Sequence, residues 1–172
     1  IPNVFGEFCK PNYNSFISTL SYNLVNKIKN PKIKNSNIQI LHVSKVIEEI
    51  IKIIDKQKNG KFYLKGKIYK IKELYLKLNY FHSHYQNFII PYLGNQDDIN
   101  LFNTYRSFTF PKHSNLKIKD NKDNRGNLYE LIKSYNQGQA FYSITKPGII
   151  RGNHLHFNKI ERFVVIKGKA II

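Results

Sequence analysis

The sequence has little cysteine and no long apolar run. Its 172 residues hold a single cysteine, Cys9, which excludes a disulfide framework within the chain and fits a reducing compartment. No basic segment leads into an apolar run at the start, as a signal peptide would require, and no apolar stretch is long enough to span a bilayer. We therefore expect a cytoplasmic protein with no membrane partner.

Acidic residues are also scarce, because 11 Asp and Glu stand against 28 Lys and Arg and leave a net charge of +17. Such a charge raises the question of nucleic-acid binding. Only Arg106, Arg125, Arg151 and Arg162 are arginines, and the lysines are scattered among Asn and Ile rather than gathered in a block. We therefore expect no specific nucleic-acid partner, and some attraction to anionic ligands such as nucleotide diphosphates.

The hydrophobic pattern changes near Phe110 and Pro111. Before this point it predicts helices at about 15–29, 45–56, 71–86 and 96–105, and strands at 37–43 and 62–69. The second helix should bury one apolar side, made of Val46, Ile47, Ile50, Ile51 and Ile54, and Ser44 should cap it. After this point short strands and turns follow, at LKIKD, NLYELIK and QAFYSIT. We expect an α+β protein with one part at 1–110 and a second at 111–172.

Histidines and a carboxylate are closely spaced in the stretch GIIRGNHLHFNKIERFVVIKG, from Gly148 to Gly168. His154 and His156 share one face if this stretch is a strand. A turn at 157–160 would bring a second strand, 161–166, back beside the first, with Glu161 near the two imidazoles. Two histidines and one carboxylate suit a divalent transition metal with open positions for substrate.

The spacing Gly-x5-His-x-His-x4-Glu-x6-Gly resembles the first cupin motif, so this part should form the first strands of a cupin β-barrel. We expect His154, His156 and Glu161 to bind the metal, with zinc the expected ion. His154 and His156 are also the candidate catalytic residues, since an imidazole has a suitable pKa for a general base. Alternatives remain: exposed strand histidines, a cupin without metal, or an epimerase that uses the same His as a base.

The opening stretch IPNVFGEFCKPNYNS resembles the substrate loop of extended short-chain reductases. Both halves in order resemble bacterial UDP-2-acetamido-2,6-dideoxy-hexulose reductases of capsule and O-antigen synthesis, in which a reductase domain precedes a cupin domain. The resemblance implies that 1–110 is the substrate-binding end of an α/β reductase domain. It also implies two steps on a UDP-sugar, on the way to UDP-N-acetyl-L-fucosamine. The cupin epimerises carbon 3 of a 4-keto sugar, and the reductase then reduces the ketone with NADPH.

The same resemblance marks substrate-binding candidates, namely Asn3, Tyr13, Asn14 and Ser15 in the opening loop, with Arg125 and Arg151 near the cupin motif. Asn3 and Asn14 could instead satisfy loop backbone. Arg125 lies in a turn, DNRG, similar to a sugar-cupin turn, and Arg151 could hold a phosphate or the keto oxygen. Arg151 as a solvated rim residue is the plain alternative.

Two features of a reductase do not occur in the 172 residues: a Gly-rich phosphate loop on a first βα unit and a Tyr-x3-Lys pair. The chain starts at Ile1 rather than Met and ends within an apolar segment. We therefore expect a fragment that is inactive alone, with NADP bound by an N-terminal part outside it and a homodimer when complete. The alternative function is a non-catalytic sugar-binding or dimerising cupin module attached to a reductase.

Overall fold

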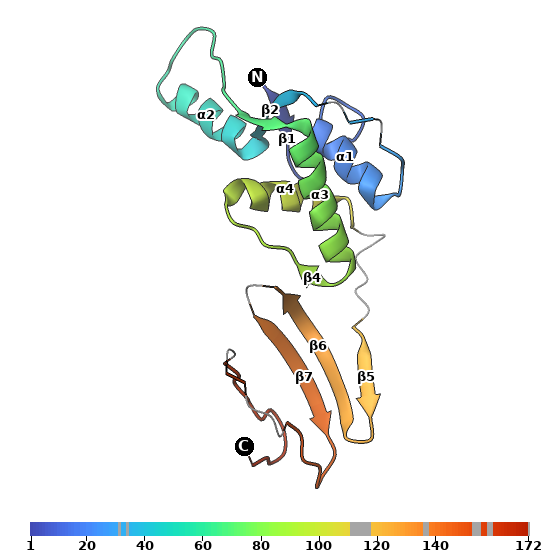
Figure 1. Cartoon of the computed structure of the whole chain (residues 1–172). Coiled ribbons are helices and arrows are strands. Elements are labelled where there is room, and N and C mark those ends of the chain that lie inside the picture. The colour runs from blue at the N-terminus through green and yellow to red at the C-terminus, as the bar shows by residue number, and fades with distance from the viewer. Residues whose placement is uncertain are drawn as a thin grey trace.

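The computed structural model describes residues 1–30, 32–33, 35–110, 118–135, 138–152, 156–157 and 160–171. These residues form a mixed α/β structure with two sheets, drawn in Figure 1. The first sheet has the order β1-β2-β3, with bounds Asn3–Phe5, Asn37–His42 and Lys67–Lys70. The predicted mixture of helices and strands is thus confirmed, although the strand predicted at 62–69 is shorter and begins later.

Four helices accompany the first sheet: α1 at Phe16–Val25, α2 at Val43–Asp55, α3 at Ile71–Gln86 and α4 at Gln96–Ser107. Strand β1 pairs in parallel with β2, and α1 lies in the connection between them. Parallel neighbours need such a crossover because the chain must return to the same end of the sheet. Strand β3 then pairs antiparallel with β2.

The hydrophobic core lies where α1, α3 and α4 meet beside the first sheet. Its central side chains come from all three helices and are almost fully buried: Ile17 and Leu20 from α1, Leu74, Leu78 and Phe81 from α3, and Leu101, Phe102 and Tyr105 from α4. Phe5 of β1 and Ile40 of β2 complete the cluster on the sheet side. The apolar residues that recur at helical spacing on α3 are therefore buried, as their spacing predicts, because they face the other two helices.

Helix α2 corrects one prediction. Its apolar residues do recur at helical spacing, but Ile47, Ile50, Ile51 and Ile54 are between 47% and 66% exposed. No residue of α2 is buried. Its N-cap is His42 rather than the predicted Ser44, because His42 Nδ1 accepts a hydrogen bond from the Ser44 backbone N–H. The sequence thus identifies the apolar face, while the described part of the chain supplies nothing that covers it.

The second sheet is built around β6, Gly126–Ser134. Strand β7, Gln139–Thr145, pairs antiparallel along almost the whole of β6. The other edge of β6 is shared by β5, Asp120–Asp123, and the two-residue strand β4, Ile89–Ile90. Strand β4 comes from the first predicted part and pairs with β6 in parallel. Figure 1 shows it beside the end of β6. A segment from before Phe110 therefore belongs to the sheet that lies after it.

The predicted metal hairpin is not formed as two strands in the described residues. Residues 146–152, 156–157 and 160–171 are assigned to no strand, and Ile160, Val164 and Ile166 are at least 77% exposed. A strand is stable only with a neighbour to accept its backbone hydrogen bonds. The alternation in FVVIKG therefore does not by itself produce a hairpin in this structure.

Candidate functional site

His156 and Glu161 come together even though no strands carry them. His156 Nε2 lies 3.4 Å from Glu161 Oε1, and both side chains are about one-third exposed. The sequence prediction placed these two side chains side by side across a turn, and the structure does bring them together. His154, the third predicted metal ligand and the other candidate base, lies outside the described residues.

The described donors fit a divalent transition metal in type, because an imidazole nitrogen and a carboxylate oxygen converge. Among the residues that the structure describes, no group of three or more His, Cys, Asp and Glu is placed to hold a metal ion. His156 and Glu161 therefore account for two donors of the predicted set. The third predicted donor is His154, which lies outside the described residues.

Arg125 is held at the turn between β5 and β6. Its Nε and Nη2 donate to Asp123 Oδ2 at 2.9 and 2.6 Å, and its backbone N–H donates to Asp123 Oδ1 at 2.8 Å. The hydrogen bond to Arg125 holds the pKa of Asp123 below its usual range. The turn requires Gly126, whose φ of +135° disfavours a side chain and whose Cβ would collide with the carbonyl oxygen of Ile144. Arg125 thus presents a fixed guanidinium, about half exposed.

Arg151 reaches the same turn from the segment after β7. Its Nη2 lies 3.8 Å from Asp123 Oδ1, and its side chain is 21% exposed. Its Nε and Nη2 are buried, and neither makes a hydrogen bond to a described residue. Buried donors are normally satisfied, so this guanidinium is suited to an anionic or carbonyl oxygen. Lys146 Nζ, bonded to the Asn124 carbonyl oxygen at 2.9 Å, adds a third cation at this turn.

Asn3 is the first residue of β1 and has a structural role beside the opening loop. Its Nδ2 donates to the Asn14 carbonyl oxygen at 2.9 Å, and its Oδ1 accepts from the Phe16 backbone N–H at 3.1 Å. Phe16 is the first residue of α1, so Asn3 caps that helix from a neighbouring strand. Each end of the amide therefore makes one bond that holds the backbone, while its second N–H and second lone pair stay available, so the predicted contact with substrate stays a prediction.

The other three predicted residues of this loop differ from one another in exposure. Ser15 is buried and its hydroxyl donates to Ser18 Oγ at 2.9 Å, so it does not face a ligand. Asn14 is exposed, and Tyr13 is 65% exposed. Lys10, which the sequence prediction missed, lies with its Nζ 5.7 Å from the centre of the Tyr13 ring. The signal that could have found it is the Lys-x-x-Tyr spacing in a short loop.

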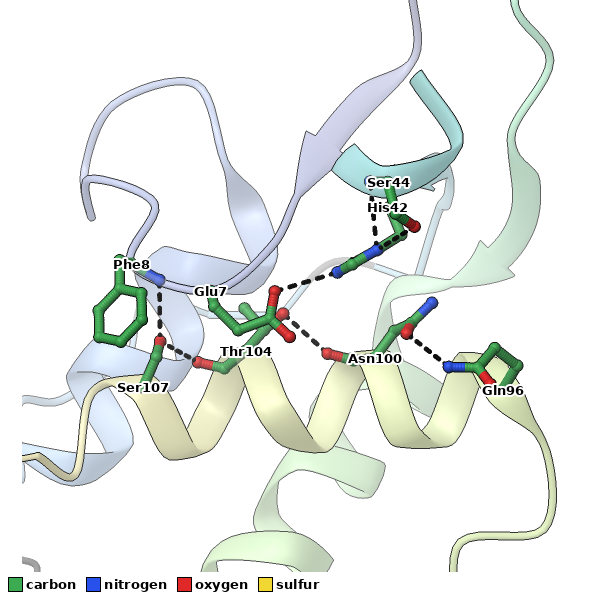
Figure 2. A network of polar contacts seen from close by, with 8 residues as sticks. All are labelled: Glu7, Phe8, His42, Ser44, Gln96, Asn100, Thr104 and Ser107. Atoms are coloured by element: carbon green, nitrogen blue, oxygen red, sulfur yellow. Dashed lines mark hydrogen bonds and ion pairs between the residues drawn. The ribbon is translucent and has the colours of Figure 1, made fainter. Parts of the chain in front are cut away.

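The start of this loop is tied to two helices (Figure 2). The Phe8 backbone N–H donates to Ser107 Oγ at 3.1 Å, which anchors the loop to the end of α4. Glu7 Oε2 lies 3.3 Å from His42 Nε2, at the start of α2. On the other side of the same ring, His42 Nδ1 lies 2.8 Å from Ser44 Oγ. These contacts connect the start of the loop to α4 and to the start of α2.

Comparisons with known proteins place the chain among enzymes of polysaccharide biosynthesis by similarity. A family described as "Polysaccharide biosynthesis C-terminal domain" matches residues 121–172. A curated protein of Pseudomonas aeruginosa strain PA103, UDP-2-acetamido-2,6-beta-L-arabino-hexul-4-ose reductase, is 31% identical over 175 residues. That similarity covers 99% of this chain and 47% of the relative. The chain therefore spans about half the length of this relative.

Solved structures of CapF are similar in fold. CapF with the inhibitor 3-isopropenyl-tropolone gives a TM-score of 0.76 at 29% identity, over 88% of this chain and 45% of that one. The capsular polysaccharide assembling protein CapF of Staphylococcus aureus gives 0.73 at 28% identity, over 88% of this chain and 42% of that one. The chain resembles about half of CapF. Among the described residues, no helix is both long and apolar enough to cross a membrane.

Proposed function

We propose that this chain is part of a bacterial enzyme that modifies a nucleotide sugar for a surface polysaccharide. The substrate class is a UDP-linked 4-keto-6-deoxy-N-acetylhexosamine, and the product leads to UDP-N-acetyl-L-fucosamine. The observation that carries the proposal is the 31% identity to a UDP-sugar reductase along 99% of the chain. The similarity to CapF in fold supports the same class. In this proposal, residues 1–110 belong to a reductase domain and 111–172 to a cupin domain.

The step assigned to the second part is epimerisation at carbon 3. The ketone at carbon 4 acidifies the neighbouring C–H bond, so a neutral imidazole can take the proton, and the electron pair of that bond forms an enolate. Return of a proton to the opposite face of carbon 3 inverts the centre. His156 is a candidate for the base, with Glu161 at 3.4 Å to orient its ring. His154 is the alternative base.

The enolate needs stabilisation at the carbon 4 oxygen. Arg151 supports this role, because its buried Nε and Nη2 have no hydrogen-bond partner among the described residues. Arg125, which Asp123 holds in a fixed orientation, is the candidate for a second anionic group of the substrate, such as a phosphate. Alternatively, His154, His156 and Glu161 would hold a divalent metal, with zinc the expected ion, and in that case none of them is the free base. The metal would supply Lewis-acid stabilisation of the same oxygen.

Reduction of the ketone is not assigned to any residue of this chain. The phosphate loop and the Tyr-x3-Lys pair do not occur in the sequence, so NADP would be bound elsewhere in a longer protein. The 172 residues alone are therefore expected to be inactive. A homodimer, a cytoplasmic location and the lack of a specific nucleic-acid partner also stay predictions.

Exchange of the carbon 3 hydrogen tests the proposed epimerisation without the need for NADPH. The protein encoded by the whole reading frame is incubated with the 4-keto sugar nucleotide in D2O, and deuterium at carbon 3 is followed by NMR. His156→Ala or, if His154 is the base, His154→Ala should reduce the exchange at least about 100-fold, as expected when a general base is lost. Lys29→Ala, which removes an exposed lysine from the segment after α1, is the control. Unchanged exchange in both site variants would reject the assigned chemistry.

A non-catalytic cupin module is the second candidate. In this candidate, the second part binds sugar or drives dimerisation and only positions a reductase. Metal analysis of the whole protein separates the two, since a module that only binds sugar or dimerises needs no metal. Such a module would also show no deuterium exchange.

A further inference from the structure

His42 lies where the opening loop, residues 6–15, passes the start of α2. It is the last residue of β2 and the N-cap of α2, and its side chain is only 10% exposed. Phe5 at the end of β1 packs edge-on against the imidazole, with the two ring centres 5.2 Å apart. Gly6 allows the close approach of the loop, because a Cβ there would lie 2.6 Å from Val43 Cγ1. The imidazole is therefore enclosed between the loop and the helix.

Both ring nitrogens of His42 have a partner, as Figure 2 shows. Nδ1 accepts a hydrogen bond from the Ser44 backbone N–H at 3.4 Å and lies 2.8 Å from Ser44 Oγ. Nε2 lies 3.3 Å from Glu7 Oε2. Among the residues that the structure describes, Glu7 is the one charged side chain that forms an ion pair with this ring. Lys45, the first charged residue of α2, is paired instead with Glu48 at 2.8 Å.

The two contacts of the ring respond to a proton in opposite ways. The cap needs a free lone pair on Nδ1, so it forms only while the imidazole is neutral with its hydrogen on Nε2, which then donates to the Glu7 carboxylate. A second proton would occupy Nδ1. The new N–H can donate to Ser44 Oγ, but the Ser44 backbone N–H loses its acceptor, and a positive charge at a helix N-terminus is unfavourable. The same charge strengthens the contact with Glu7.

Helix α2 is sensitive to the loss of its cap. None of its residues is buried, so its first turn has few tertiary contacts to hold it. The start of the loop is better anchored, because the Phe8 N–H, next to Glu7, donates to Ser107 Oγ of α4 at 3.1 Å. A proton on His42 should therefore appear as fraying at the start of α2 and as a tighter hold on a loop that is already in place.

We propose that His42 is a pH-sensitive link between the opening loop and α2. Protonation loosens the first turn of α2 and tightens the hold of Glu7 on the loop, and loss of the proton reverses both effects. Histidine suits this role because imidazoles gain and lose a proton near neutral pH. The inference does not depend on the proposed reaction. Tyr13 and Asn14, two of the predicted substrate contacts, lie in the same loop, so the link makes the order of that loop depend on pH.

Hydrogen–deuterium exchange followed by mass spectrometry, on the protein encoded by the whole reading frame, tests the two opposite directions. Peptides that cover residues 5–10 and 43–48 are compared at about pH 5.5 and about pH 8, after correction for the intrinsic pH dependence of amide exchange. At the lower pH, corrected exchange should be several-fold slower in the loop peptide and several-fold faster at the start of α2. A change of both peptides in the same direction, or of neither, would overturn the inference.

Two variants separate the two contacts. His42→Asn keeps a side-chain acceptor at the N-cap, where Asn is among the preferred residues, but cannot gain a proton, so both peptides should lose their pH response. Glu7→Gln keeps an acceptor for the Nε2–H without the charge, so the loop should lose its response while the start of α2 retains it.

Glu48→Gln is the matched control, because it removes a carboxylate of α2 that pairs with Lys45 and not with His42. Both pH responses should remain in this variant. A response that persists in His42→Asn would assign the titration to another group and reject the link. If that variant fails to fold, the opposite directions in the unaltered protein and the selective loss in Glu7→Gln still decide the question.

Discussion

Helix α2 and the three-helix core offer a direct comparison of covered and uncovered apolar side chains. Leu78 of α3 is fully buried, at 0% exposed, whereas Ile51 of α2 is 51% exposed. Leu78→Ala removes methylene groups from a packed core and leaves a cavity, so it should lower the free energy of unfolding by about 2–5 kcal/mol. Ile51→Ala leaves no cavity, because solvent already reaches the side chain.

The expected loss at Ile51 can be worked from its exposure. Full burial of an isoleucine side chain is worth about 1.5–3 kcal/mol, and about half of that applies to a half-exposed one. Alanine keeps part of this area and is the better helix former by a few tenths of a kcal/mol. Ile51→Ala should therefore cost about 0.5 kcal/mol or less. Ile47→Ala, at 50% exposed, should behave in the same way.

Urea unfolding followed by circular dichroism measures both effects on the 172-residue chain, at two or more protein concentrations. A cost above about 2 kcal/mol for Ile47→Ala or Ile51→Ala would refute the reasoning, because it would mean that the helix face is covered in solution. A midpoint that rises with protein concentration would identify the cover as a second copy of the chain. A concentration-independent midpoint with small losses would agree with the exposed face.

Three further predictions concern the loop and the turn. Asn3→Ala should lower the free energy of unfolding by about 1–3 kcal/mol, since two backbone groups lose their partner; urea unfolding checks this. Arg125→Gln should raise the pKa of Asp123 toward its ordinary value, as followed by carboxyl NMR. Because the folded pKa of Asp123 is depressed, its contribution to stability is present above the unfolded value of about 3.9 and is lost as pH falls through the folded pKa. Gly126→Ala should destabilise the β5–β6 turn by more than about 1 kcal/mol, measured in the same way, because φ is +135°.

The elements predicted best are those whose local pattern and tertiary packing agree. Helix α3 runs from Ile71 to Gln86, as predicted, because its apolar residues meet α1 and α4. Strand β7 also has the predicted bounds, Gln139–Thr145, since β6 pairs along almost its whole length. In both elements, a neighbouring element packs against or pairs with the residues that the sequence pattern marks, so local preference and tertiary contacts agree.

The predictions that failed needed information about a neighbour. The amphipathic pattern of α2 indicates which face is apolar, but only the fold shows whether another element covers it. In the same way, residues 161–166 have a strand-like composition but no described partner strand, so no strand forms. Strand β4 is two residues long and pairs with residues more than 40 positions later, and no local signal predicts such a contact.

The sequence predicted which residues lie at the candidate sites better than it predicted what each of them does. His156 and Glu161 come together, as their spacing in the sequence suggested. Asn3 at the start of β1 and Ser15 at the end of the loop both make bonds that hold this region. Their amide and hydroxyl groups can either cap backbone or bind a ligand, and only the bonded geometry separates these uses. Lys10 lies near the Tyr13 ring because of the way the loop folds, which the sequence alone did not predict.

The pairing of β4 with β6 bears on how the two proposed steps would work together. Two sequential reactions on one sugar benefit when the domains that perform them keep a fixed orientation. Ile89 and Ile90 lie before the proposed boundary at 110/111, yet they bond to Lys133 and Ser134 beyond it. Next to this joint, the rings of His84 and Tyr135 meet at 5.5 Å. Backbone hydrogen bonds and a ring contact resist rotation better than a linker alone, so separation at the boundary should expose β6 and loosen both parts.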